Sequence, residues 1–195
     1  MEGALEIPIF PLGTVLYPAG LLPLRIFEPR YVEMTRSCLR GNTVFGVSLI
    51  QAGFEVGKPA VPCTVGCTAR IVEWTEPAPN RFHLSARGET RFRILRRWTT
   101  EAGLVLASAQ LLPPPDPVEL PSRYQPLRVL LQQLIGQFGA DSFPRPQRLD
   151  DAAWVGYRLC ELLPVPPERR QRLLEEPEPL QLLAQVEQLV RELRE

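Results

Sequence analysis

Residues 5–39, LEIPIFPLGTVLYPAGLLPLRIFEPRYVEMTRSCL, form an apolar stretch that is interrupted by prolines and leads into a helix. The alternation of Leu5, Ile7 and Ile9 predicts a half-buried strand. Each proline in the stretch removes a backbone donor, so we expect its strands to be short or peripheral. We therefore interpret this stretch as scaffold rather than as a place for catalysis.

A helix is predicted from Pro29 to Arg40. Glu28 precedes Pro29, which places proline at the first helical position and an anion near the positive end of the helix dipole. Gly41 and Asn42 provide a C-terminal stop. The predicted apolar face has helical spacing and consists of Tyr31, Met34, Thr35, Cys38 and Leu39.

The segment 11–31, PLGTVLYPAGLLPLRIFEPRY, resembles the opening of the Lon substrate-binding domain, which is the N-terminal domain of the ATP-dependent protease Lon. Within it, LRIFEPRYVEM (24–34) is especially similar to the version in stand-alone bacterial Lon-domain proteins and in ring-finger proteins with a Lon-like domain. This resemblance implies a PUA-like β pseudo-barrel followed by a C-terminal helical bundle. It covers nearly the whole chain, because further similar segments follow in order at 44–50, 65–73, 81–95 and 169–193.

The residue pattern predicts the same α+β architecture. Residues 1–112 are β-rich, residues 113–121 form a stiff proline-rich connection, and residues 122–195 form a helical bundle. In the β-rich part we expect strands over 43–51, 68–75 and 104–112, and a strand that carries Phe82, Leu84 and Ala86 on one face. We also expect a hairpin loop at 76–81 and a bend or bulge at Gly88. The strands are short and numerous, which suggests a closed or partly closed barrel.

In the helical part, an apolar stripe over 127–138 predicts a helix that ends at Gly139. Asp150 or Asp151 can cap a second helix running to about Leu163. A short helix should start at Pro166 and Pro167, and a last helix should run over about 179–194.

The composition argues against partners that are attracted mainly by the net charge of the chain. The chain has 22 Lys and Arg and 22 Asp and Glu, so no net field attracts nucleic acid or an anionic membrane. The start, MEGALEIP, lacks the features of a signal peptide, and no stretch is long enough to span a bilayer. We expect a cytoplasmic protein that does not associate with a membrane.

The four cysteines predict reduced thiols rather than a disulfide framework. Cys63 and Cys67 could form a three-ligand metal site only if His83 converged on them. Small buried thiols are the more common case for free cysteine. We therefore expect no metal and no cofactor.

The sequence also argues against an enzyme. It has no G-x-x-x-x-G-K-[ST] phosphate loop, and its only lysine is Lys58, so the resemblance to Lon does not extend to ATPase or Ser–Lys protease parts. The only histidine, His83, alternates with Phe82 and Leu84 and so belongs to the polar face of its strand. An uncharacterised hydrolase is the weakest alternative.

The resemblance implies a module that binds unfolded polypeptide or a protein partner, with its oligomeric state left open. A strip of arginines from Arg87 to Arg97 offers an RNA-binding alternative, but a solvated strand face is favoured because acids are interspersed and the net charge is zero. Glu28 and Arg30 should form a structural ion pair, with each other or with this strip. Within the strip we single out Arg87, Arg91 and Arg93. Candidate polypeptide contacts are Leu21, Leu22, Phe54, Trp74 and Trp98, but for each of them a place in the core is favoured because large apolar residues are normally buried.

Overall fold

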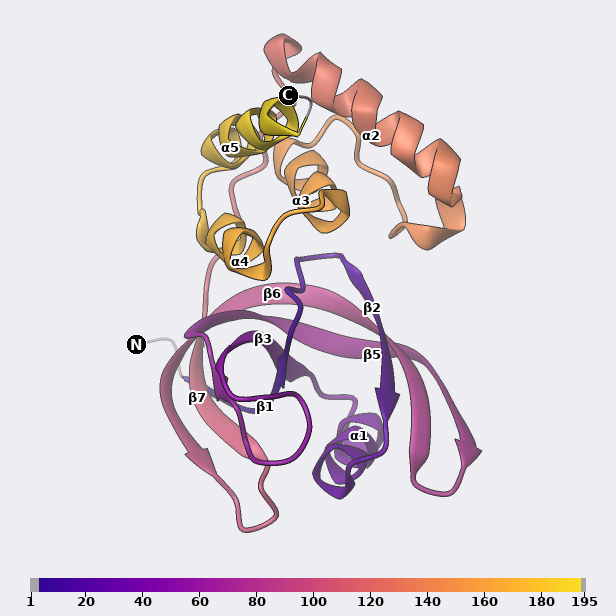
Figure 1. Ribbon diagram of the computed structural model, residues 1–195, viewed down its shortest axis with the longest axis vertical. Coiled ribbons are helices and arrows are strands. Elements are labelled where there is room, and N and C mark those ends of the chain that lie inside the picture. The colour runs from indigo at the N-terminus through magenta and orange to yellow at the C-terminus, as the bar shows by residue number, and fades with distance from the viewer. Residues whose placement is uncertain (1–3, 194–195) are drawn as a thin grey trace. The chain divides into compact units, whose positions relative to one another are not determined.

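A computed structural model of the protein describes residues 4–193 and divides into two compact units, the first ending at Pro113 and the second beginning at Pro114 (Figure 1). We call them the barrel unit and the helical unit. The fold is mixed α+β, as predicted. No helix in the described part of the chain is long and apolar enough to cross a membrane.

The barrel unit is a twisted sheet that closes on itself (Figure 1). Neighbouring strands follow the order β1-β7-β6-β5-β3, and a parallel pairing of β1 with β3 completes the ring. Strand β4 extends the sheet beyond β3, and β2 pairs with β6 outside the ring. The strands are β1 (Leu5–Leu12), β2 (Leu21–Ile26), β3 (Phe45–Ala52), β4 (Val61–Pro62), β5 (Val65–Ala78), β6 (Arg81–Thr99) and β7 (Val105–Leu111).

The prolines of β1 do not make this strand short or peripheral, so that prediction is wrong for β1. The strand has eight residues and neighbours on both sides. Strand β7 pairs with it only up to Ile9, and β3 pairs with it only from Ile9 onward. Pro8 and Pro11 therefore each have only one neighbouring strand. A proline costs the sheet no hydrogen bond where its backbone nitrogen faces away from that strand. The prediction holds for β2, where Pro23 lies in a peripheral strand.

The core of the barrel unit forms between helix α1 (Pro29–Gly41) and the inner faces of the strands. Phe82, Leu84 and Ala86 are buried on one face of β6, as their alternation predicted. Tyr31 of α1 stacks on Phe10, with ring centroids 4.0 Å apart. The helix ends at Asn42, which adopts the left-handed conformation, so the predicted stop is confirmed. From α1, Tyr31, Val32, Met34 and Cys38 join this core.

Gly88 lies where the loop before β2 crosses β6. The Gly88 N–H donates to the carbonyl of Gly20 at 2.9 Å, and the Gly88 carbonyl accepts from the Ala19 N–H at 2.8 Å. A Cβ at this position would be 2.2 Å from the Tyr17 carbonyl oxygen, so only glycine permits this approach. The pairing of β5 with β6 shifts register directly after Gly88, as expected for a bulge.

The hairpin between β5 and β6 turns more tightly than predicted. The strands continue to Ala78 and from Arg81, so the turn is only Pro79 and Asn80 rather than residues 76–81. Asn80 has a φ of 61°, a conformation that asparagine tolerates well. Its N–H donates to the Glu76 carboxylate at 3.0 Å, which holds the tight turn in place.

The helical unit has its own core. Its helices are α2 (Gln125–Phe138), α3 (Ala152–Leu162), α4 (Pro167–Glu175) and α5 (Pro179–Glu192), with 3-10 turns at Ser122–Tyr124 and Ala140–Ser142. Asp151 caps α3 by accepting from the Trp154 N–H at 2.9 Å, which resolves the choice between the two candidate caps. Residues 118–120 pair with 150–152 through backbone hydrogen bonds. Fully buried residues of this core include Leu131, Val155, Leu159, Leu182, Leu183 and Val186.

Candidate functional site

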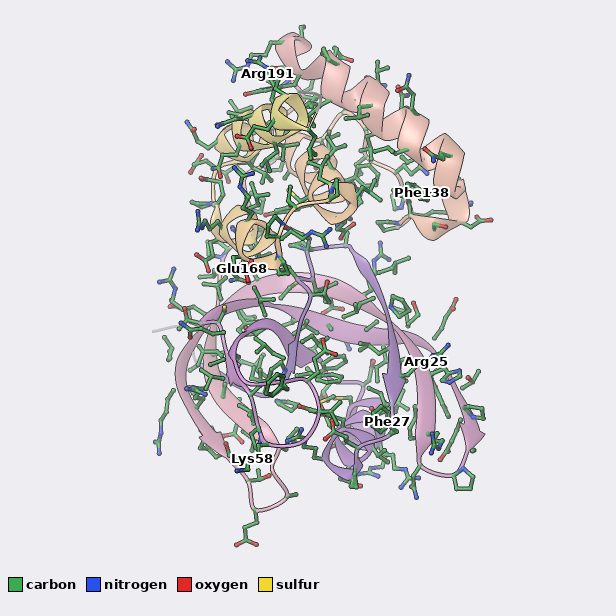
Figure 2. The ribbon with its side chains drawn as sticks, viewed as in Figure 1. Arg25, Phe27, Lys58, Phe138, Glu168 and Arg191 are labelled. Atoms are coloured by element: carbon green, nitrogen blue, oxygen red, sulfur yellow. The ribbon has the colours of Figure 1, made fainter. Side chains whose placement is uncertain are left out.

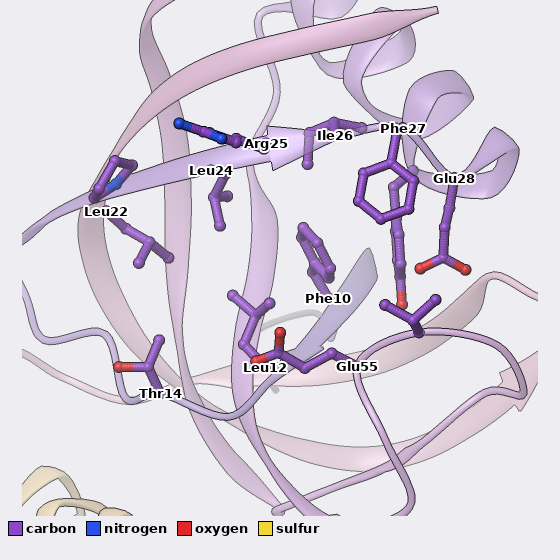
Figure 3. Close-up of a pocket in the computed structure, with 13 residues that line it drawn as sticks. Phe10, Leu12, Thr14, Leu22, Leu24, Arg25, Ile26, Phe27, Glu28 and Glu55 are labelled. Atoms are coloured by element: carbon purple, nitrogen blue, oxygen red, sulfur yellow. The ribbon is translucent and has the colours of Figure 1, made fainter.

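A pocket of about 340 Å³ opens in the barrel unit beside β2 (Figure 3). Its walls come from the end of β1, from β2 with the residues that join it to α1, and from the loop after β3. We call this pocket the β2 groove. Its apolar lining includes Phe10, Leu12, Leu22, Leu24, Tyr31 and Val56.

The groove exists because β2 lies outside the closed ring of strands. Within residues 4–193, β2 has only one strand neighbour, β6, and the pairing of β1 with β7 stops at Ile9. The end of β1 and the open edge of β2 therefore both border the groove. Leu22 and Leu24 are half-buried and point toward Leu12 and Thr14 (Figure 3). Strand alternation thus supplies an apolar wall next to an unpaired edge.

Two of the apolar side chains that line the groove are largely exposed. Phe27, which lines the groove, has 53% of its surface exposed and lies at the surface of the barrel unit (Figures 2 and 3). In the loop after β3, Phe54 is 83% exposed and Val56 is 60% exposed. Scattered single exposed apolar residues are ordinary, but Phe27 and Val56 both line one pocket, and Phe54 is the residue before the lining residue Glu55. Exposed apolar side chains gathered in this way are typical of an interaction site.

The charged groups of the groove are partly fixed. Arg30 donates to the Glu28 carboxylate at 2.9 Å and to the Gly103 carbonyl at 3.1 Å, so the predicted pair forms within the FEPRY segment and not with the arginine strip. Burial raises the pKa of Tyr31, and the nearby Arg30 guanidinium opposes this shift. Glu55 accepts a hydrogen bond from the Gly13 N–H at 2.5 Å.

The predicted polypeptide contacts do not gather in one place. Leu22 lines the groove, and Phe54 directly precedes the lining residues Glu55 and Val56. Trp74 is 51% exposed on β5 with its ring 5.9 Å from that of Phe82, and it is not among the lining residues of the groove.

Of the other two predicted contacts, Trp98 is half-buried on β6, opposite Leu106. Leu21 is exposed on β2. The alternative that these residues belong to the core is therefore wrong for Leu21, Phe54 and Trp74.

Several lining residues were missed by the sequence analysis. Tyr31 was interpreted only as part of the apolar face of a helix, and Phe10, Leu12, Phe27 and Val56 were not singled out. The available signal was the apolar pair Phe54 and Val56 between two glycines, a composition that is unusual for an exposed loop.

The arginine strip is not one solvated face, so that interpretation requires correction. Arg91 is buried, with 4% of its surface exposed, and Arg87 is half-buried, whereas Arg93, Arg96 and Arg97 are exposed. Around Arg91 the strand β6 pairs with β5 on one side, and the Arg91 carbonyl accepts from the Leu112 N–H on the other. Phe92 next to it is also buried, so both faces of the sheet are covered there.

The histidine and the four cysteines differ in their exposure. His83 is exposed on β6, and Cys38, Cys67 and Cys160 are buried while Cys63 is half-buried. Among residues 4–193, no group of three or more His, Cys, Asp or Glu side chains could hold a metal ion.

One carboxyl group in the helical unit has a strongly shifted pKa. Burial raises the pKa of Glu161 to about 7, against the opposing effect of Arg158, whose guanidinium donates to it at 2.8 Å. Arg158 is itself fully buried. We interpret this pair as a structural ion pair, because both side chains come from one buried helix, α3, and are three residues apart.

Comparison with known proteins relates the chain to one family. The family model of the ATP-dependent protease La (LON) substrate-binding domain matches residues 6–192. A Lon N-terminal domain protein from Xanthomonas campestris is 34% identical in sequence, with a TM-score of 0.78 over 93% of this chain and 96% of that chain. The N-terminal domain of the Mycobacterium avium complex Lon protease is 13% identical, with a TM-score of 0.60 over 94% of this chain and 97% of that chain, and shows the fold alone.

Similarity to complete Lon proteases is confined to a small part of their length. Lon protease of Anaeromyxobacter dehalogenans (strain 2CP-C) is 30% identical over 91 residues, which cover 46% of this chain and 11% of that protein. Lon protease 2 of Myxococcus xanthus shows the same identity and coverage.

Proposed function

Because the chain belongs to the family of the ATP-dependent protease La (LON) substrate-binding domain, we propose that it is a non-catalytic module that binds polypeptide in the β2 groove. The occupant is an unfolded or extended segment of another protein with exposed apolar side chains. The absence of a phosphate-binding loop motif in the sequence supports a binding role without ATP hydrolysis.

The observation that carries this proposal is the apolar rim of the groove. Phe27 and Val56 are each more than half exposed and line a pocket that is also lined by Leu22 and Leu24, and the exposed Phe54 is two residues before Val56 in the same loop. Burying one such side chain contributes about 1.5–3 kcal/mol, whereas association costs at least about 4 kcal/mol in lost freedom. Several apolar contacts are therefore needed, and we expect affinities near the micromolar range rather than tight binding.

The RNA-binding alternative has less support. Arg91 is buried, and the Arg96 guanidinium lies 5.7 Å from the ring of Trp98 within the same strand. The arginine strip therefore offers neither a continuous basic surface nor a freely accessible aromatic platform of the kind that binds single strands.

Fluorescence anisotropy with fluorescein-labelled, reduced and carboxymethylated α-lactalbumin tests the proposal. The double variant Phe27→Ser, Val56→Ser should weaken binding by about 10-fold or more, because two exposed apolar side chains that line the groove are lost. Phe138→Ser is the matched control, since Phe138 is 55% exposed at the end of α2 in the helical unit (Figure 2). Failure of the wild-type protein to bind, or equal loss in the control, would contradict the proposal.

A further inference from the structure

We propose that the β2 groove receives its polypeptide as an added β-strand, which pairs with the free edge of β2 and directs alternate apolar side chains, and one basic side chain, into the groove. This inference rests on the proposed function and specifies the conformation and chemistry of the bound segment. It follows from the hydrogen bonding of β2, from the side chains beside its edge, and from the charges of the groove.

The first step identifies which backbone groups of β2 are free. Leu21 lies opposite Arg87 in the antiparallel pairing with β6, so Gly20 lies opposite Gly88. The Gly88 N–H donates to the Gly20 carbonyl, which makes this a hydrogen-bonded pair. Hydrogen-bonded and non-hydrogen-bonded pairs alternate along an antiparallel ladder. The pairs of Leu22, Leu24 and Ile26 are therefore hydrogen-bonded to β6, and the residues between them direct their backbone groups away from it.

The position of Pro23 agrees with this assignment. Pro23 has no N–H, and it falls among the residues that direct their backbone groups away from β6, where it costs the sheet no hydrogen bond. The free edge therefore presents the N–H groups of Leu21 and Arg25 and the carbonyls of Leu21, Pro23 and Arg25. Because β2 has no strand neighbour on this side within residues 4–193, the edge is a template for another strand.

The second step concerns the side chains next to this edge. Leu22 and Leu24 point into the groove, and Arg25 points away from it (Figure 3). Residues of an added strand that lie opposite Leu22 and Leu24 share their face. Every second side chain of the bound segment would therefore enter the groove, and the intervening ones would lie outside beside Leu21 and Arg25. The groove selects apolar residues at the inward positions.

The third step concerns charge. Three of the side chains that line the groove carry a charge at neutral pH, Arg25, Glu28 and Glu55. Glu28 is neutralised by Arg30 at 2.9 Å, and Arg25 points away from the groove. Glu55, which accepts from the Gly13 N–H, is therefore the carboxylate that an incoming segment meets. A Lys or Arg at an inward position near Glu55 complements this charge.

The experiment uses fluorescein-labelled peptide TVTVTKTVT-amide and a series of copies in which single backbone nitrogens are methylated. Methylation removes an N–H donor and blocks close approach of a strand, so binding should fall by about 10-fold or more at every second position and remain nearly unchanged at the positions between. The alternation is expected for either strand direction. In an antiparallel complex the sensitive positions are the outward threonines, and in a parallel complex they are the inward residues.

A second arm tests the side-chain assignment. Valine-to-serine changes in the peptide should weaken binding, whereas threonine-to-serine changes should not. Replacing the peptide lysine by glutamate should weaken binding to the wild-type protein more than to Glu55→Gln. Glu101→Gln is the matched control, because Glu101 is an exposed carboxylate in the turn between β6 and β7 that does not line the groove.

The outcomes separate this inference from the proposed function. If neither the peptide nor carboxymethylated α-lactalbumin binds, the proposed function fails. If the peptide binds but methylation has the same effect at every position, only strand addition is overturned. Strand addition is also overturned if sedimentation shows that a second copy of the chain occupies the edge and the peptide does not displace it.

Discussion

Substitution of Gly88 by alanine should unfold the barrel unit selectively. A Cβ at this position would lie 2.2 Å from the Tyr17 carbonyl oxygen and 3.2 Å from the Cys67 Sγ. The nearest obstacle is buried backbone rather than a flexible side chain, so β6 and the loop before β2 must separate. Overpacking of this kind costs about 1–3 kcal/mol, and loss of the two hydrogen bonds to Gly20 and Ala19 adds about 1 kcal/mol each.

The net effect is smaller than the sum of these costs. Replacing glycine by alanine also restricts the unfolded chain, which favours folding by about 0.4–1 kcal/mol. We therefore expect Gly88→Ala to lower the free energy of unfolding of the barrel unit by about 2–4 kcal/mol. Gly136→Ala is the control, because Gly136 is exposed within α2 and a Cβ there would contact nothing within 4 Å. It should stabilise the helical unit by about 1 kcal/mol.

Hydrogen exchange measured by mass spectrometry distinguishes the two units, which a single melting curve cannot do reliably for a chain with two compact parts. Peptides from β5 and β6 should lose protection in Gly88→Ala, while peptides from α3 and α5 should keep it. Because residues 17–20 lead directly into β2, the same variant should also bind unfolded polypeptide more weakly. The steric argument would be refuted if β6 peptides of Gly88→Ala exchanged as slowly as those of the wild-type protein, or if both units lost protection equally.

Two further predictions concern ionisable groups. The pKa of Glu161 is raised from its ordinary value of 4.5 to about 7 in the folded protein. The folded state therefore holds this proton more tightly, and the stability of the helical unit should fall as pH rises from about 5 to 8. The full pKa shift corresponds to at most about 3 kcal/mol in the free energy of unfolding, and about 1–2 kcal/mol is expected because 26% of the Glu161 side chain is exposed. Urea titrations at several pH values measure this dependence, and Glu161→Gln should abolish it. The same pH dependence in the variant would contradict the assignment. Of the four thiols, only Cys63 should react rapidly with a thiol reagent in the native protein, because the other three are buried and burial raises the pKa of Cys38. Rapid reaction of Cys63→Ser with the same reagent would show that a second thiol is accessible.

Local features were predictable because each depends on neighbours close in the chain. The start of α1 at Pro29, its apolar face, and the buried alternation on β6 follow from spacing within a few residues. The cap at Asp151 was narrowed to two residues for the same reason.

Features that depend on strand neighbours were missed or wrong. The arginine strip was interpreted as a solvated strand face, but Arg91 and the adjacent Phe92 are both buried, so both faces of β6 are covered there. The prolines of β1 predicted a short or peripheral strand, but the strand has eight residues, and β7 and β3 each pair with a different half of it. Periodicity describes the two faces of one strand and contains no information on what lies against them.

The sequence by itself determined that the stretch 5–39 is a proline-interrupted strand region followed by a helix, and its resemblance identified the family. Only the tertiary structure decided that Phe10, Leu22 and Val56 meet around one groove beside an unpaired strand edge. These residues are far apart in the chain, and no local propensity relates them. Closure of the ring through β1 and β3 leaves β2 outside it, and that long-range pairing creates the groove.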